Sequence, residues 1–164
     1  MGKIYDQIDA QLRDFIARQH LFFVATAPQS PDGRINLSPR GLDTFRILGP
    51  TTVAFADLTG SGAETIAHLR ENGRITLMFC AFEGPPKILR LQGRGEVLLP
   101  ESADYAEVAP SLPSLPGQRA IIRIRCDRIS DSCGFGVPRM QYQGDRTQLV
   151  DWAEQKGSEG VAEY

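Results

Sequence analysis

The sequence predicts a mainly β protein with flanking helices, in which six antiparallel strands form a small closed or half-closed barrel. Segments rich in β-branched and aromatic residues recur along the chain, and most are separated by turns of hairpin length. Apolar residues at helical spacing are concentrated near the two ends and in one short central crossover. Glycines inside one strand segment, Gly93 and Gly95, indicate the strong curvature of a small barrel.

The length and composition are those of one globular domain. The chain has 164 residues, of which 41% are hydrophobic, so it can bury a sizeable core. We expect an N-terminal helix in residues 1–20, the barrel in residues 21–131, and a C-terminal tail with a helix in residues 132–164. The sequence contains no internal repeat and no linker that would separate a second domain.

Charge and cysteine content exclude several classes of protein. The formal charge of -2 argues against a nucleic-acid partner, since such proteins usually carry a net basic footprint. No N-terminal signal peptide and no run of about 18 apolar residues is present, so we expect a cytoplasmic protein without a membrane partner. Cys80, Cys126 and Cys133 form no CxxC pair, so neither a disulfide framework nor a metal site is predicted.

The elements follow one another in a simple order. Apolar residues at helical spacing predict an amphipathic helix over residues 4–19. The predicted strands span residues 21–27, 34–41, 51–57, 74–82, 87–99 and 120–129. Residues 45–50 are expected to form a loop, residues 102–108 a short helix, and residues 147–156 a polar helix.

The second and the fourth of these predicted strands also indicate where a ligand or a covering surface would lie. The second strand places Asn36 and Ser38 on one face, and Pro39 interrupts its pairing near the end. Arg40 therefore lies at an irregular strand end, where it either faces a ligand or is solvated. The fourth strand is apolar on both faces, which is typical of an interior strand that is covered on both sides.

The stretch with the clearest indication of function joins the third strand to a short helix and runs from Asp57 to Thr65. Its Gly-rich turn leads into a helix N-terminus, whose free N–H groups and dipole favour an anion such as a phosphate. The same residues contain Ser61-x-x-Glu64, a capping box that would satisfy those N–H groups without a ligand. The turn by itself leaves both interpretations open.

Four segments together resemble a known family. NLSPRG, VAFADLTGSGAET, ENGRITLMF and KILRLQGRGEV, in this order, resemble the FMN-binding split β-barrel of the pyridoxamine 5′-phosphate oxidase-like superfamily. The tail SCGFGVPRMQY resembles an uncharacterised subgroup of that superfamily. The resemblance implies a six-stranded antiparallel split β-barrel of the FMN-binding type, and a homodimer with flavin sites at its interface.

The resemblance also implies a set of cofactor-binding residues: Ser38, Arg40, Asp57, Thr59, Ser61, Thr65 and Lys87. Thr59, Ser61 and Thr65 fall in the turn that would hold the phosphate. Arg40 and Asp57 fall at strand ends near the flavin. Lys87 begins the strand that reaches the flavin from the partner subunit in the family, with a solvated lysine after a Pro-Pro turn as the alternative.

The chain departs from the family pattern in that turn. Where the oxidase has an Arg-Lys pair, this chain has Ala63-Glu64, so a negative charge stands near the expected phosphate. Positive charge would then come from Arg40, or from Arg70 or Arg74. The oxidase's C-terminal tryptophan and arginine have no counterpart in the tail, so oxidation of pyridoxamine phosphate itself is not expected.

The sequence therefore predicts an FMN flavoprotein, an oxidoreductase for an unidentified small molecule, in which the flavin performs the hydride chemistry. We assign no catalytic side chain, because no Ser/His/Asp or Cys/His arrangement stands out. One alternative is a ligand-binding or sensing protein for haem or deazaflavin, with His20 and His68 as candidate haem ligands. We expect both histidines to be exposed or to cap helices instead. A second alternative is an interaction module in which the turn only caps a helix.

Overall fold

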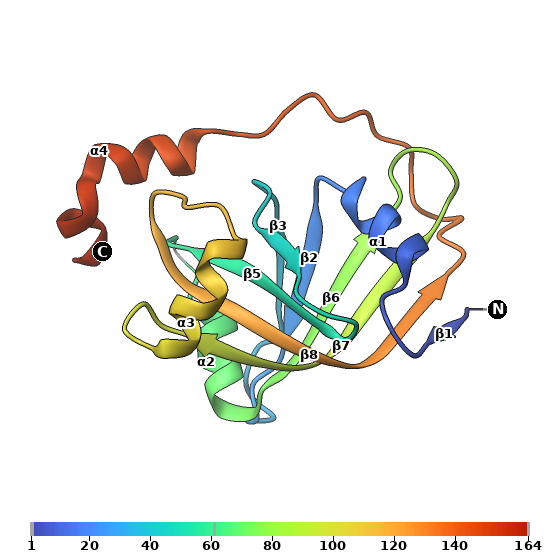
Figure 1. The fold of residues 1–164 in the computed structure, drawn as a ribbon, viewed down its shortest axis with the longest axis horizontal. Coiled ribbons are helices and arrows are strands. Elements are labelled where there is room, and N and C mark those ends of the chain that lie inside the picture. Colours follow the sequence, from blue (N-terminus) through green and yellow to red (C-terminus); the bar gives the residue numbers. More distant parts are fainter. Residues whose placement is uncertain (1, 61, 164) are drawn as a thin grey trace.

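The computed structural model describes residues 2–60 and 62–163 of the chain. Figure 1 shows a strongly bent sheet with helices at its margins. The strands are β1 (Ile4–Tyr5), β2 (Phe22–Thr26), β3 (Asn36–Arg40), β4 (Phe45–Ile47), β5 (Thr52–Leu58), β6 (Arg74–Cys80), β7 (Ile88–Leu98) and β8 (Gln118–Ser132). The helices are α1 (Ala10–Ala17), α2 (Glu64–Asn72), α3 (Ala103–Val108), the 3₁₀ turn η1 (Ala109–Ser111) and α4 (Gln148–Ala162).

The strands of the described residues form one antiparallel sheet in the order β3-β2-β6-β7-β8-β5-β4, with β1 added to β8. The two end strands, β3 and β4, are consecutive in sequence and are joined only by residues 41–44. Because so short a connection cannot span an open sheet, the sheet curls until its ends approach each other. The result is a half-barrel whose ends are linked by a turn.

That turn is conformationally unusual. Leu42 and Asp43 have φ values of 61° and 54°, a left-handed backbone conformation that residues other than glycine rarely adopt. The Thr44 hydroxyl donates to the Gly41 carbonyl at 2.8 Å, and Thr44 is buried. The turn therefore holds a defined shape at the mouth of the half-barrel, directly after Arg40.

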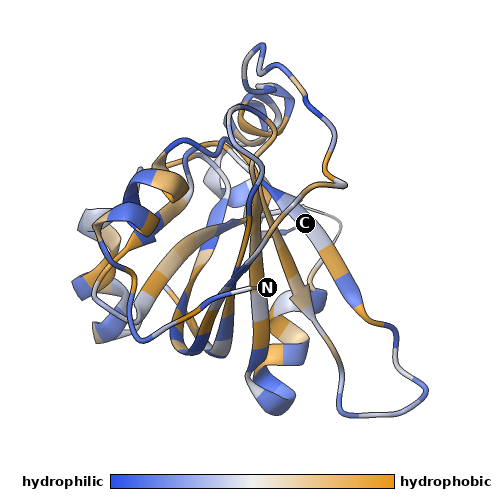
Figure 2. Ribbon diagram, turned by 90° about the vertical axis from the view of Figure 1, so that its right-hand side faces the viewer, coloured by the Kyte–Doolittle hydropathy of each residue, from blue (hydrophilic) through white to orange (hydrophobic). Residues whose placement is uncertain are grey.

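Apolar side chains fill the inside of the curl. Phe22, Phe45, Phe55 and Phe79 come from four strands, and their ring centroids lie 5.1–5.6 Å apart in the packed pairs. Such edge-to-face and tilted pairs add stabilisation beyond the burial of area. Figure 2 shows hydrophobic and hydrophilic residues alternating along several strands, as expected where one face is the core.

Helices close the margins of the half-barrel. At the start of α1 the Asp9 side chain accepts from the Leu12 N–H, and the helix buries Leu12, Phe15 and Ile16. The crossover helix α2 ends at Gly73, which has the left-handed φ of 68° that a helix-terminating glycine supplies. Among the helices of the described residues, none is long and apolar enough to cross a membrane.

The predicted fold class is confirmed, but the number of strands is higher than the six predicted. Residues 45–50, predicted as a loop, contain β4, and the predicted first helix begins only at Ala10, with β1 before it. Both added strands are very short: β1 pairs with the distant strand β8, and β4 forms a hairpin with β5, the next strand along the chain. Local periodicity cannot reveal such strands, because a few residues do not establish a period. The C-terminal helix α4 is broken at Gly157, which has a φ of 68° and a ψ of 170°, so its first segment ends at the predicted residue 156 and a second short segment continues to Ala162.

Candidate functional site

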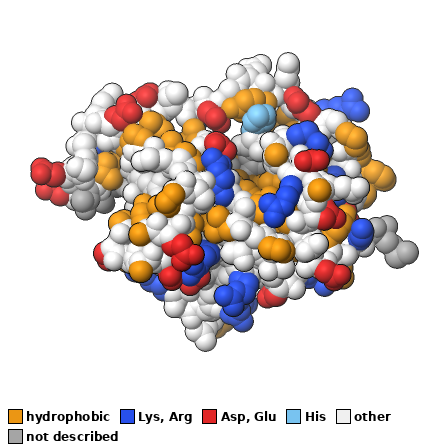
Figure 3. Space-filling view, in the orientation of Figure 1, with side chains coloured by type: hydrophobic (Ala, Val, Ile, Leu, Met, Phe, Trp, Pro, Cys, Tyr) orange, Lys and Arg blue, Asp and Glu red, His pale blue; other side chains and the backbone are white. Residues whose placement is uncertain are grey.

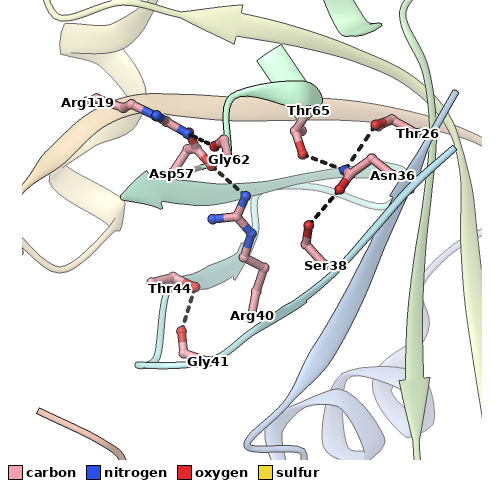
Figure 4. A network of polar contacts seen from close by, with 10 residues as sticks. All are labelled: Thr26, Asn36, Ser38, Arg40, Gly41, Thr44, Asp57, Gly62, Thr65 and Arg119. Carbon is pink, nitrogen blue, oxygen red and sulfur yellow. Dashed lines mark hydrogen bonds and ion pairs between the residues drawn. The ribbon is translucent and has the colours of Figure 1, made fainter. Parts of the chain in front are cut away.

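A buried ion cluster lies at the mouth of the half-barrel, where three strands bring charged side chains together (Figure 4). Asp57, near the end of β5, has a fully buried side chain. Its Oδ2 accepts from the Arg119 Nε at 2.7 Å, and its Oδ1 lies 2.9 Å from an Nη of Arg40. Arg119 comes from β8, which pairs with β5, whereas Arg40 comes from the end strand β3. The Arg40–Asp57 pair therefore links two strands that share no backbone pairing.

The cluster keeps hydrogen-bonding capacity unused. The Arg40 Nη and the Asp57 Oδ1 are within ion-pair distance, but they are not aligned for a hydrogen bond. Among the described residues, the buried Arg40 Nε and Asp57 Oδ1 atoms lack a hydrogen-bond partner. An Nη of Arg119 also donates a hydrogen bond to the Gly62 carbonyl, at 2.6 Å. A guanidinium has five N–H donors, so both arginines retain donors for an anion.

A chain of polar side chains runs from this region along the inner face of β3. The Asn36 amide donates to Thr65 Oγ1 at 3.0 Å and to Thr26 Oγ1 at 3.2 Å, and its oxygen accepts from the Ser38 hydroxyl at 2.7 Å. Thr26 Oγ1 lies 3.0 Å from Nδ1 of His68. In Figure 4, Asn36, Thr65 and Thr26 lie on one side of Arg40, and Arg119 and Gly62 on the other. The site therefore has a charged half and a neutral hydrogen-bonding half.

The turn before α2 differs from the capping box that the sequence left open as an alternative to an anion site. The helix begins at Glu64, and its N-cap is Ala63, which offers no side-chain hydrogen bond. Glu64 is thus the first helical residue instead of the third, and its carboxylate folds back so that a Cβ on Gly62 would lie 2.7 Å from it. The negative charge of Glu64 remains near the helix N-terminus, where it interacts favourably with the dipole. Ser61 lies outside the described residues.

Thr59 and Thr65, the other two residues assigned to this turn, are both buried. The Thr59 N–H donates to the Gly117 carbonyl at 2.7 Å, and this bond ties the turn to the start of β8. Thr65 joins the polar chain of β3. The structure therefore brings Ser38, Arg40, Asp57, Thr59 and Thr65 into one region.

Lys87 is not part of this region within one chain. Its ammonium lies 3.3 Å from an Asp131 carboxylate oxygen and 3.4 Å from the Tyr5 hydroxyl. Burial and the hydrogen bond to Asp131 raise the pKa of Tyr5 to about 12. Burial also acts to raise the pKa of Asp131, but its hydrogen bonds from Tyr5, Lys3 and Lys87 outweigh this and hold the pKa below its ordinary value. A flavin contact from Lys87 in a partner subunit remains a prediction.

The expectation for His68 is corrected, whereas His20 is exposed as expected. His68 is not exposed on α2 but is buried, because α2 turns that side chain toward Thr26 on β2. His20, at the end of α1, stacks on Tyr142 with ring centroids 3.6 Å apart and an interplanar angle of 7°. Arg74, proposed as a source of positive charge, instead bonds to the Asn72 side chain and the Pro28 carbonyl.

Sequence reasoning missed Arg119, which supplies positive charge at the turn through its bond to the Gly62 carbonyl, whereas Arg70 lies in the last turn of α2, at the opposite end of the helix. Arg119 stands directly before the predicted strand at residues 120–129, and Asp57 ends the predicted strand at 51–57. An antiparallel pairing of these two strands would have placed them side by side. Nothing in the sequence, however, specified which strands are neighbours.

The fold and the site define a class of protein: a split β-barrel whose mouth carries paired arginines around a buried carboxylate. The family model for pyridoxamine 5′-phosphate oxidase matches residues 8–133. The pyridoxamine 5′-phosphate oxidase family protein ustO of Aspergillus flavus is 46% identical over 150 residues, which are 88% of this chain and 59% of the relative. The chain belongs to the pyridoxamine 5′-phosphate oxidase family, and it spans about three-fifths of the length of this curated relative.

Solved structures show the same fold at lower identity. HupZ of Group A Streptococcus has a TM-score of 0.58 and 24% identity, over 74% of this chain and 91% of that chain. The FAD binding protein of Mycobacterium smegmatis has a TM-score of 0.55 and 17% identity, over 79% of this chain and 96% of that chain. These similarities establish the barrel and its connections.

Proposed function

We propose that the protein binds FMN at the mouth of the half-barrel and is an oxidoreductase that acts on a small molecule. The observation that carries this proposal is the Arg40–Asp57–Arg119 cluster, in which the buried Nε of Arg40 has no hydrogen-bond partner among the described residues. An anionic group with several acceptor oxygens, such as the phosphate of FMN, fits such donors. Family membership and the fold shared with an FAD binding protein support a flavin.

The roles of the residues follow from their positions. Arg40 and Arg119 would bind the phosphate, and Asp57 would hold both guanidinium groups in place while reducing their net charge. The donors of Ser38 and Asn36 are already used, so Ser38 Oγ and Asn36 Oδ1 would accept from an N–H group at the polar edge of a ring system lying along β3. Bound flavin supplies the hydride chemistry, and the protein supplies orientation and exclusion of water. The substrate is a small molecule of unassigned structure.

The outer face of the sheet supports a homodimer. Ile35, directly before the end strand β3, and Leu37 within it are 77% and 64% exposed, although both are large and apolar. Half-buried apolar side chains continue this surface across the neighbouring strands. Leu37 pairs with Ala25 on β2, and Phe23 on β2 pairs with Met78 on β6. A contiguous apolar surface on a sheet is typical of a protein interface. A second copy of the chain would cover it.

The test of the flavin site distinguishes binding of the phosphate from binding of the ring system. We would measure the Kd of FMN and of riboflavin, which lacks the phosphate, by equilibrium dialysis. Arg119→Ala and Arg40→Ala should each weaken FMN binding by about tenfold or more, as expected for a lost charged hydrogen bond, with little change for riboflavin. Arg123→Ala is the matched control, because this β8 arginine pairs with Glu96 and Asp104 away from the cluster.

Two results would contradict the proposal. If the wild-type protein retains no flavin after gel filtration, the family fold serves another ligand. If the arginine variants bind FMN as tightly as the Arg123→Ala control, the phosphate lies elsewhere. A Soret band on addition of haem, absent in a His20→Ala variant, would support haem instead.

A further inference from the structure

His68 is a buried titratable side chain to which the proposed function gives no role. It is 7% exposed, and its Nδ1 lies 3.0 Å from the hydroxyl oxygen of Thr26, which is 3% exposed. Because His68 follows Thr65 by three positions on α2, the two side chains lie on the same face of the helix, where they meet Thr26 of β2 and Asn36 of β3. One helix therefore carries two members of the polar chain that runs along β3.

The direction of each hydrogen bond in this chain follows from the number of protons available. Both N–H groups of the Asn36 amide are donated, one to Thr65 and one to Thr26. The amide oxygen of Asn36 can only accept, so the hydroxyl proton of Ser38 points to it. Thr26 has one hydroxyl proton, and this proton is left for Nδ1 of His68. His68 therefore accepts at Nδ1, which places the proton of its neutral ring on Nε2.

We infer that His68 is a positioning residue of the binding site, which acts through Thr26 and Asn36 to make Ser38 a hydrogen-bond acceptor. An amide can turn over, so that its oxygen and nitrogen exchange places. With Asn36 turned over, the Thr26 proton would go to the amide oxygen, and Thr26 could bond to His68 only if Nδ1 carried a proton. Ser38 would then accept from Asn36 and be free to donate. The position of one proton on His68 is thus linked to the character of Ser38, three hydrogen bonds away.

Burial of the inner end of the chain makes this linkage strict. Thr26, Thr65 and His68 are all less than a tenth exposed, so water does not replace a missing partner there. Asn36 and Ser38 are only half-buried, and in Figure 4 Ser38 lies at the end of the chain beside Arg40. The outer end of the chain is therefore the part that a ligand can contact.

The consequence for binding is a preference for ligands that donate at this position. A ring edge with an N–H group would pair with Ser38, whereas an edge that offers only acceptors would leave polar groups unpaired on both sides. This inference rests on the proposed function, since the ligand against Ser38 is taken to be the flavin ring. The oxidised ring system of FMN has one N–H group, at N3.

The first test determines the position of the proton on His68, in the full chain without a ligand. Nitrogen chemical shifts measured by NMR distinguish a ring nitrogen that carries a proton from one that does not. The chain has two histidines, so a His20→Gln variant assigns the signals. At mildly alkaline pH we expect Nδ1 of His68 to be unprotonated and Nε2 to carry the proton. A proton on Nδ1 would overturn the inference.

The second test measures the preference for the N–H group. Equilibrium dialysis should show that the wild-type protein binds FMN about tenfold or more tightly than its N3-methyl derivative, as expected for a lost hydrogen bond. This ratio should fall at least about threefold in Ser38→Ala and in His68→Leu. His68→Gln, whose amide oxygen can accept from Thr26, should retain it. Thr52→Val, at the start of β5, is the matched control and should also retain it.

The outcomes distinguish this inference from the proposed function. If FMN binds but the ratio is the same in wild type and His68→Leu, His68 does not set the character of Ser38, while the flavin site stands. If FMN does not bind at all, the proposed function is wrong, and the role of His68 in flavin binding is wrong with it. Thermal unfolding of each variant would show that a changed ratio does not result from loss of the fold.

Discussion

Asp57 shows how one buried charge determines the arrangement of its neighbours. Moving a carboxylate out of water is costly unless it is paired, and the side chain of Asp57 is fully buried with an arginine on each side. The side chains of Arg40 and Arg119 are 19% and 24% exposed, so part of each reaches the surface at the mouth of the barrel. The carboxylate therefore fixes their position and leaves their outer N–H groups available.

Replacing this carboxylate should destabilise the protein. Asp57→Asn keeps the shape but leaves two arginines without a counter-ion, and we expect a loss of about 3 kcal/mol in the free energy of unfolding, measured by urea denaturation. Asp43→Asn is the control, because Asp43 pairs with Arg46 but is 77% exposed. That change should cost less than about 1 kcal/mol. Equal losses in the free energy of unfolding of the two variants would mean that solvent screens the ion pairs of Asp57 as it screens the exposed pair of Asp43.

The element β1 shows how a very short strand is held in place by side chains. It pairs with β8 at Ile4 and Tyr5 only. The Tyr5 hydroxyl donates to Asp131 at 2.5 Å, and Lys87 lies against both groups. The ammonium of Lys87 also lies over the rings of Tyr5 and Phe15, each 5.5 Å from the centroid. These contacts tie β1 and α1 to the barrel.

The stability of this attachment should depend on pH in the alkaline range. Tyr5 has a folded-state pKa of about 12 against an ordinary value of 10.0, so the folded protein retains the proton that the unfolded chain releases. Its contribution is fully present below pH 10 and is lost as the pH rises toward 12. The wild-type protein should therefore lose stability relative to Tyr5→Phe between these values, as measured by urea denaturation at each pH. A constant difference between the two proteins would contradict this assignment.

At the scale of the whole molecule, the outer apolar face should decide the oligomeric state. Leu37 is too exposed to contribute much to the fold of one chain, so a charge there acts mainly on an interface. We expect the wild-type protein to sediment as a dimer, and Leu37→Asp to raise the dimer dissociation constant at least about tenfold. Leu149→Asp, at an exposed apolar position on α4, should leave it unchanged. A wild-type monomer at high concentration would show that this face has another role.

The charged surface around the mouth can be followed in Figure 3, where basic side chains border a hollow with a hydrophobic floor. Such a combination binds molecules with an anionic end and an apolar body. Neither the net charge of -2 nor the composition indicates this local concentration of positive charge. It arises because arginines from β3 and β8 meet at one end of the curled sheet.

Prediction from the sequence succeeded where local chemistry decides the structure. Asn72-Gly73 ends α2 because a glycine adopts the left-handed conformation without strain, and the alternating strand segments placed Asn36 and Ser38 on the face where they meet. It failed for His68, whose burial depends on packing against β2, and it left open a capping box that does not match the start of α2 at Glu64.

The sequence by itself determined the barrel class, because periodicity and turn residues act over a few positions, and its resemblance to the family pointed to five residues that the structure brings into one region. Only the tertiary structure decided that Arg119 meets Asp57 across 62 residues, and that α4 encloses a cavity beside them. It also decided that Lys87 binds Asp131 within one chain. Strand order and register bring these groups together, and these depend on the packing of the whole barrel rather than on any short stretch of sequence.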